Sequence, residues 1–155
     1  MASATPHIIL TSVNGAQREP LSDLAANGAI TPGDLIERGS NGKLAAIATA
    51  GKPNQGMVAL ENPFAPDDTN PVIDQQYAAN DAVFYTYLQS GDQAYMRLAA
   101  SQTVAIGDPL VPSATAGCLA KATLDATSVE GALVGFADEA VTTTGSVGRI
   151  RVRKA

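Results

Sequence analysis

The chain has 155 residues, of which 45% are hydrophobic and 16% charged, with a formal net charge of -5. This length suits one domain with a core that needs no disulfide or metal, and the acidic balance argues against nucleic acid, which is bound through many Lys and Arg contacts to phosphates. The chain has no run near the roughly 18 apolar residues of a membrane helix and no signal-peptide pattern, so we expect a soluble protein made in the cytoplasm.

The N-terminal segment contains a short apolar run, "HIIL". We expect residues 1–12 to form either an arm that adds as a strand to a neighbouring molecule or an ordinary first strand, and residues 13–155 to form a single β-rich domain. In an arm, backbone hydrogen bonds hold the segment and apolar side chains fill the neighbour's pockets. The candidate contact residues here are His7, Ile8, Ile9 and Leu10.

Residues 20–28, "PLSDLAANG", carry the one helix signal of the chain. Leu21 and Leu24 are three residues apart, and Gly28 is a typical helix stop. We therefore predict at most one short helix, at this position.

An internal repeat follows. "PGDLIERGSNGKLAAIATAG" at 32–51 aligns with "IGDPLVPSATAGCLAKATLD" at 106–125, so that Gly-Asp matches Gly-Asp and "GKLA" matches "GCLA". Each copy has a Gly-Asp turn, an apolar stretch, a polar loop and a second apolar stretch, which predicts the same β-hairpin twice. The two aspartates are better explained as acceptors for turn backbone amides, beside a glycine with positive φ, than as a catalytic dyad.

The sequence between the copies predicts strands on either side of a loop. A short strand is expected at 57–60, and residues 61–74 form an acidic excursion loop because three prolines prevent a continuous helix or a central strand. A weak calcium site from Asp67, Asp68, Asn70 and Asp74 is the alternative, although the spacing does not match the calcium-loop pattern. Residues 83–88, rich in rings on both faces, are predicted as the centre of the core, and "AYMRLAA" at 94–100 as a strand or a short helix.

The end of the chain predicts a buried strand at 132–137 and a last strand at 147–153. In the last strand Ile150 and Val152 alternate with Arg149, Arg151 and Arg153, so the arginines form an exposed row on an acidic molecule. That row can balance acids on an adjacent strand, meet acids of a sister subunit or another protein, or lie solvated.

The fold class that follows is all-β. About ten short strands separated by turn signals predict a compact barrel or sandwich with an extended N-terminal segment. No combination of acid, base and orienting group suggests catalysis, because His7 is the one histidine and Cys118 lies in an apolar setting. We expect no enzyme activity, cofactor or resident metal.

Several segments together resemble the small head decoration, or cement, proteins of tailed bacteriophages. The resemblance extends from about residue 28 onward and rests on "PGDLIE", "YAANDAV" before "SGDQAYMRLA", "IGDPLV", and "VGFADEAV" followed by "RIRVR". It implies a structural virion protein made in the host cytoplasm. Such a protein binds the major capsid protein on the outer surface of the icosahedral head and stabilises contacts between capsid subunits.

We expect a homo-oligomer, with a trimer favoured over a dimer although symmetry is not carried over from the resemblance, and we expect no nucleic-acid or membrane partner. Its expected contacts are the N-terminal residues named above and the three arginines of the last strand. The alternative function is a surface carbohydrate- or ligand-binding β module. That reading needs exposed aromatic platforms, and Tyr77 and Phe64 are the candidates.

Overall fold

The predicted all-β class is confirmed by the structure, a computed structural model that describes residues 7–12, 19–64, 69–123 and 131–155. These residues form twelve strands and one 3-10 helix. The elements are β1 (Ile9–Thr11), β2 (Leu35–Arg38), β3 (Leu44–Ala46), β4 (Met57–Ala59), η1 (Val72–Asp74), β5 (Tyr85–Tyr87), β6 (Gln93–Leu98), β7 (Thr103–Val104), β8 (Pro109–Pro112), β9 (Leu119–Lys121), β10 (Gly135–Ala137), β11 (Val141–Thr142) and β12 (Gly148–Lys154).

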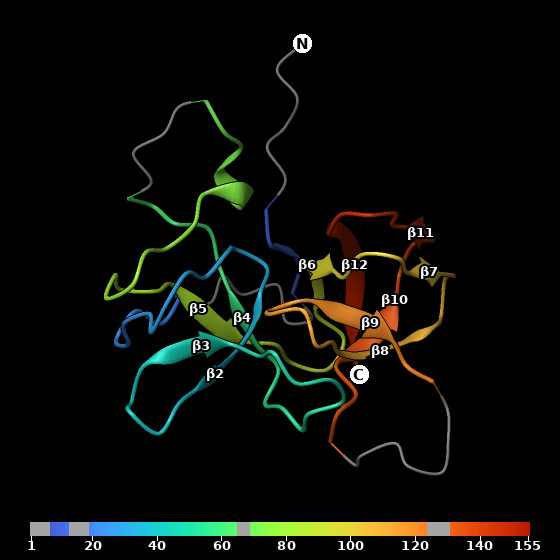
Figure 1. Cartoon of the computed structure of the whole chain (residues 1–155), viewed down its shortest axis with the longest axis horizontal. Helices are drawn as coiled ribbons and strands as arrows, with labels where there is room; N and C mark the ends of the chain where they lie inside the picture. The colour runs from blue at the N-terminus through green and yellow to red at the C-terminus, as the bar shows by residue number, and fades with distance from the viewer. Residues whose placement is uncertain (1–6, 13–18, 65–68, 124–130) are drawn as a thin grey trace.

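Five strands close into a barrel. The sheet order is β6-β12-β10-β8-β9, and a parallel pairing of Leu98 with Leu119 joins β9 back to β6. The β1 strand extends this sheet from the edge of β6, and β7 and β11 form a separate ribbon. A second sheet has the order β3-β2-β4-β5 and lies beside the barrel, to its left in Figure 1.

Alternation of side chains explains why the two longest strands lie at the centre. In β6, Ala94, Met96 and Leu98 are fully buried, and in β12 Ile150 and Val152 are fully buried. A period of two places all five inside the barrel, so residues 93–98 form a strand and not the short helix that the apolar run also allowed. The largest hydrophobic cluster continues from these residues into the second sheet.

The two predicted hairpins are confirmed, as β2 with β3 and β8 with β9. The Gly-Asp turns that precede the two hairpins share one geometry, because Gly33 and Gly107 have φ of 88° and 87°. The Asp34 carboxylate accepts the Thr31 amide at 2.7 Å. The Asp108 carboxylate accepts the amide three residues before it at 2.8 Å. Both aspartates therefore accept a turn backbone amide, as predicted. Asp81 and Asp92 accept a backbone amide three residues earlier in two further turns.

The predicted helix at 20–28 is wrong. Three residues of this segment make isolated β-bridges. Leu21 pairs with a residue of β5, Ala25 with a residue just before β5, and Ala26 with a residue of β3. A nine-residue segment gains little from an isolated helix, whereas extended backbone here finds partners on two sides. The segment therefore bridges β5 and β3, the two edge strands of the four-stranded sheet.

The prediction that residues 83–88 form the centre of the core is right about burial and wrong about position. Val83, Tyr85, Thr86 and Leu88 are buried, but Tyr87 is 44% exposed. The strand that they form, β5, is the last in the order of its sheet. Aromatic composition indicated burial of part of this stretch but carried no information on strand order.

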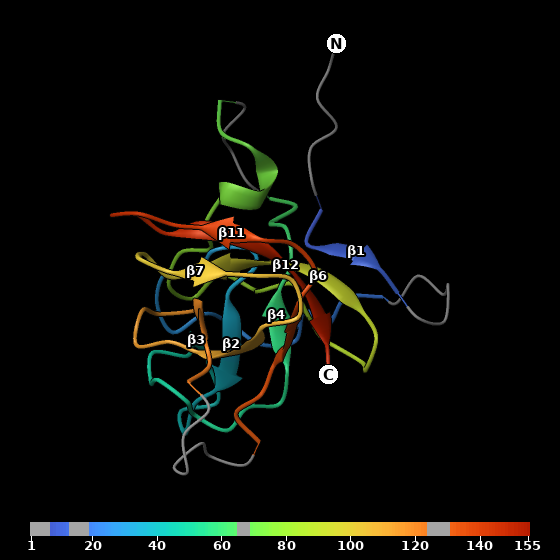
Figure 2. The same ribbon diagram turned by 90° about the vertical axis from the view of Figure 1, so that its right-hand side faces the viewer.

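Three other predicted strands follow the expectations with shifted ends, and so does the excursion loop. The predicted strands at 57–60, 132–137 and 147–153 correspond to β4, β10 and β12. The excursion loop carries η1, which lies above both sheets in Figures 1 and 2. No helix among the described residues is long and apolar enough to cross a membrane.

Candidate interaction surface

The N-terminal candidates lie on β1 and against the excursion loop. The Ile8 amide donates to Glu61 Oε1 at 2.8 Å, and His7 Nδ1 lies 3.1 Å from the same oxygen. Ile8 is fully buried in the chain's own core, whereas Leu10 is 37% exposed. The Ile8 side chain therefore fills a pocket of its own molecule, and His7 and Leu10 are the members of the group that face solvent.

The strand containing Ile9 is an edge strand within the described part of the chain. It pairs with β6 through Ile9 opposite Ala94, and the Tyr95 amide donates to the carbonyl of Ile8 at 2.7 Å. Ile9 itself is half-buried. The segment thus occupies the position of a first strand in the same sheet.

The arginines of β12 divide into two kinds. Ile150 and Val152 point into the barrel as predicted, and the side chains of Arg151 and Arg153 are 55% and 45% exposed. The Arg149 side chain is only 11% exposed, so the predicted exposed row is wrong at this residue. Alternation assigned the correct face to all three, but the excursion loop covers that face at the start of β12.

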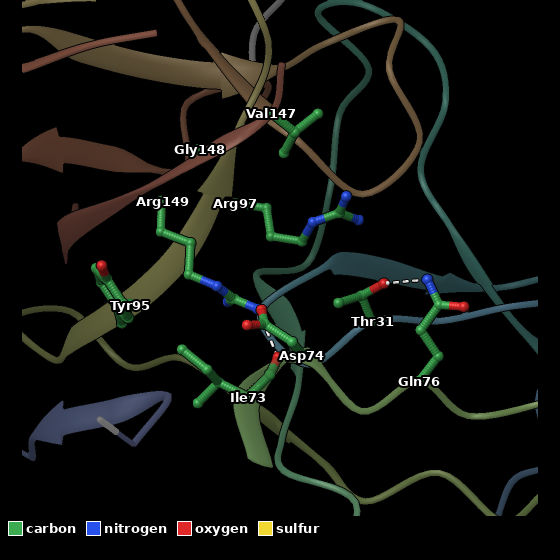
Figure 3. A pocket seen from close by; sticks show the side chains of 9 residues that line it. All are labelled: Thr31, Ile73, Asp74, Gln76, Tyr95, Arg97, Val147, Gly148 and Arg149. Atoms are coloured by element: carbon green, nitrogen blue, oxygen red, sulfur yellow. Dashed lines mark hydrogen bonds and ion pairs between the residues drawn. The ribbon is translucent and has the colours of Figure 1, made fainter. Parts of the chain in front are cut away.

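Arg149 joins three parts of the molecule. Its Nη1 donates to the Pro32 carbonyl at 2.9 Å, and its Nη2 donates to the Ile73 carbonyl and to Asp74 Oδ1, the latter at 3.0 Å. The guanidinium carbon lies 5.8 Å from the ring centre of Tyr95. Figure 3 shows this side chain extending from β12 toward η1. Arg149 therefore fastens the excursion loop and the turn before β2 to the barrel.

Arg97 is a half-buried counter-charge that the sequence did not single out. It lies directly opposite Arg149 on β6, and its Nη1 is 2.7 Å from Asp34 Oδ1. The Asp34 side chain is 3% exposed. Burial raises the pKa of this carboxyl above its ordinary value of 3.8, and the Arg97 guanidinium opposes that rise. One feature of the sequence could have pointed to Arg97 as a counter-charge, because it is the single basic residue between Lys52 and Lys121.

Both arginines line a cavity of about 540 Å³ beside η1. Thr31 and Gln76 form another part of its wall, where the Gln76 amide donates to Thr31 Oγ1 at 3.1 Å (Figure 3). Each guanidinium already has a carboxylate partner within the chain. The cavity is therefore lined by an internal ion-pair network.

The exposed pair Arg151 and Arg153 also has partners within the chain. Arg153 Nη2 lies 2.7 Å from Asp138 Oδ2, and Arg151 Nε lies 3.8 Å from Glu139 Oε2. Both acids directly follow β10, the neighbour of β12 in the barrel. Of the arrangements open to the arginines, balance by acids next to an adjacent strand is what the structure contains.

The other chemical candidates are accounted for as follows. Cys118 is buried, and burial raises the pKa of its thiol. Asp67 and Asp68 lie outside the described residues. Among the residues described, no group of three or more His, Cys, Asp or Glu could hold a metal ion. Tyr77 is fully buried, while Phe64 is 77% exposed.

Comparison with known proteins gives a relationship of fold. No protein-family model matches the sequence, and no curated protein matches it. The structure is similar to that of the N base of head fiber gp8.5 in bacteriophage phi29, with a TM-score of 0.51 and 11% identity. The likeness covers 85% of this chain and 90% of that one. At this identity it establishes a shared fold over nearly the whole length of both chains.

Proposed function

We propose that the chain is a structural protein of a phage virion that binds the outside of the head as a homo-oligomer and stabilises contacts between capsid subunits. The observation that carries this proposal is the fold shared with the base of a phage head fiber over most of both chains. The sequence resemblance to head decoration proteins supports the same role independently.

The proposed partner is the major capsid protein, and the role is non-catalytic. Binding sites repeat many times over an icosahedral shell, so modest affinity at each contact is sufficient when an oligomer binds several sites together. Of the exposed members of the predicted set, we assign His7 and Leu10 beside the excursion loop to the capsid contact, and Arg151 and Arg153 on β12 to a contact with a sister subunit.

Sedimentation with purified heads tests the proposal. Expanded heads that lack the protein are mixed with it at micromolar concentration and pelleted. We expect saturable co-sedimentation with heads and none with an unrelated shell. Leu10→Asp should weaken pelleting, and Leu21→Asp, a similarly exposed leucine outside the predicted contact set, should not. Absence of the wild-type protein from the pellet would contradict head binding.

A carbohydrate-binding module is the second candidate, and one observation favours it. Phe64 is 77% exposed and its ring centre lies 6.0 Å from that of half-buried Phe84, which together present an aromatic surface. Reproducible, saturable signals on a glycan array that are lost in Phe64→Ala would favour this function over head binding.

A further inference from the structure

The outer face of the barrel carries an exposed apolar group. Phe136 on β10 is 42% exposed, and Ile106, in the turn before β8, is 72% exposed. Phe136 lies opposite Pro109 on β8 and Arg153 on β12, so these side chains share the face that points away from the barrel interior. The residue after Ile106 donates its amide to the Ala137 carbonyl at 2.8 Å, which places this turn beside β10.

Charged residues surround this apolar group, and their charges cancel. They form three ion pairs with partly exposed side chains: Lys121 with Asp108 at 2.8 Å, Arg153 with Asp138 at 2.7 Å, and Arg151 with Glu139 at 3.8 Å. Three bases and three acids give this face no net formal charge, although the chain as a whole carries -5. We call Ile106, Pro109, Phe136 and these six charged residues the barrel patch.

We propose that the barrel patch binds the barrel patch of a second copy of this chain about a two-fold axis. An apolar centre with a polar, charged rim is the usual anatomy of a protein interface. Equal numbers of acids and bases allow each charged group to meet its opposite when the same surface faces itself. This inference rests on the proposed function in one respect: it specifies the surface through which the proposed homo-oligomer forms, and it makes that oligomer a dimer instead of the trimer that the sequence analysis favoured.

The distribution of charge favours a second copy of the chain as the partner and the barrel patch as the surface through which the two copies bind. Two chains of -5 repel each other, and they repel least where the facing surfaces are neutral. The other strongly exposed aromatic, Phe64, lies in a part of the chain where every charged residue from Glu61 to Asp92 is acidic. Pairing two copies there would bring like charges together, which disfavours that surface.

Sedimentation equilibrium of the purified full chain tests the proposal without heads. We expect a dimer mass for the wild type at roughly 100 μM and for Phe64→Asp, the control that adds the same charge at a more exposed ring. Phe136→Asp should raise the dissociation constant at least ~30-fold, the size expected for loss of a central interface residue. A monomeric wild type, or an unchanged mass for Phe136→Asp, would overturn the proposal.

A second variant distinguishes loss of the dimer interface from loss of folding. Ile106 is 72% exposed in a turn, so Ile106→Asp leaves the barrel interior unchanged and should also shift the equilibrium toward monomer with an unchanged circular dichroism spectrum. If both variants still dimerise, the patch is not the interface. Head pelleting separates the two proposals: a dimer that does not pellet contradicts head binding alone, and a monomer that pellets contradicts the dimer alone.

Discussion

Arg97→Met tests whether the buried carboxylate of Asp34 depends on one counter-charge. The substitution keeps an unbranched side chain but removes the guanidinium 2.7 Å from Asp34 Oδ1, and the Asp34 side chain is only 3% exposed. Removing one partner of a buried ion pair costs about 3–5 kcal/mol. We expect a loss near the lower end, ~3 kcal/mol, because the Thr31 amide still donates to the other carboxylate oxygen at 2.7 Å.

The loss of stability should depend on pH. Burial raises the pKa of Asp34 and Arg97 opposes the rise, so the variant raises it further. Asp34 has a higher pKa in the folded state than in the unfolded state, whose value is 3.8. Such a carboxyl binds its proton more tightly when folded, so the free energy of unfolding falls as pH rises from 3.8 through the folded-state pKa. The difference between Arg97→Met and wild type should therefore be largest at neutral pH and shrink as pH falls toward 3.8.

Urea unfolding followed by circular dichroism measures these differences at neutral and acidic pH. The double variant Asp34→Asn with Arg97→Met removes both charges and should recover most of the lost stability. Lys121→Met is the matched control, because its partner Asp108 occupies the same turn position but the lysine side chain is 45% exposed, and little change is expected. An Arg97→Met loss below about 0.5 kcal/mol, or one that is equal at both pH values, would refute the reasoning.

Three further substitutions, two of them with a matched control, test other contacts of the fold by the same unfolding measurement. A Cβ at Gly117, where φ is +73°, would lie 2.2 Å from the carboxyl carbon of Asp34. Gly117→Ala should therefore lower the free energy of unfolding by more than the roughly 1–2 kcal/mol that left-handed backbone costs a residue with a Cβ. The control is Gly51→Ala, which has positive φ but open space around the Cβ and should cost no more than that. Arg149→Gln should destabilise by about 1–3 kcal/mol and Arg151→Gln by less than about 0.5, and equal effects would contradict the fastening role of the first. Tyr77→Phe removes a buried hydroxyl that donates to the Leu60 carbonyl at 2.8 Å and should cost about 1–2 kcal/mol; an unchanged midpoint would count against that bond.

Local patterns accounted for the parts of the fold that the sequence predicted. A Gly-Asp turn needs a glycine with positive φ and an aspartate that accepts a nearby amide, so both hairpins could be read from neighbouring residues alone. Alternation in β12 likewise assigned Ile150 and Val152 to the interior. These features depend on backbone geometry within one or two strands.

Long-range contacts explain what could not be predicted. Closure of the barrel depends on Leu98 meeting Leu119, and the position of β5 at a sheet edge depends on strand order, neither of which leaves a local pattern. The period of two gave the correct face for Arg149 but could not show that Ile73 and Asp74, far away in sequence, cover it. Arg97 was missed because its partner Asp34 had already been explained by its turn.

The stoichiometry and position of the protein in intact particles test head binding most directly. Heads purified from the phage that encodes the chain, imaged by electron cryomicroscopy, should carry density that fits its barrel and four-stranded sheet outside the shell, at symmetry-related positions between capsid subunits. Heads made without it should lack that density and lose integrity at lower temperature. Absence of the chain from purified particles, or its location inside the shell, would contradict the proposed function.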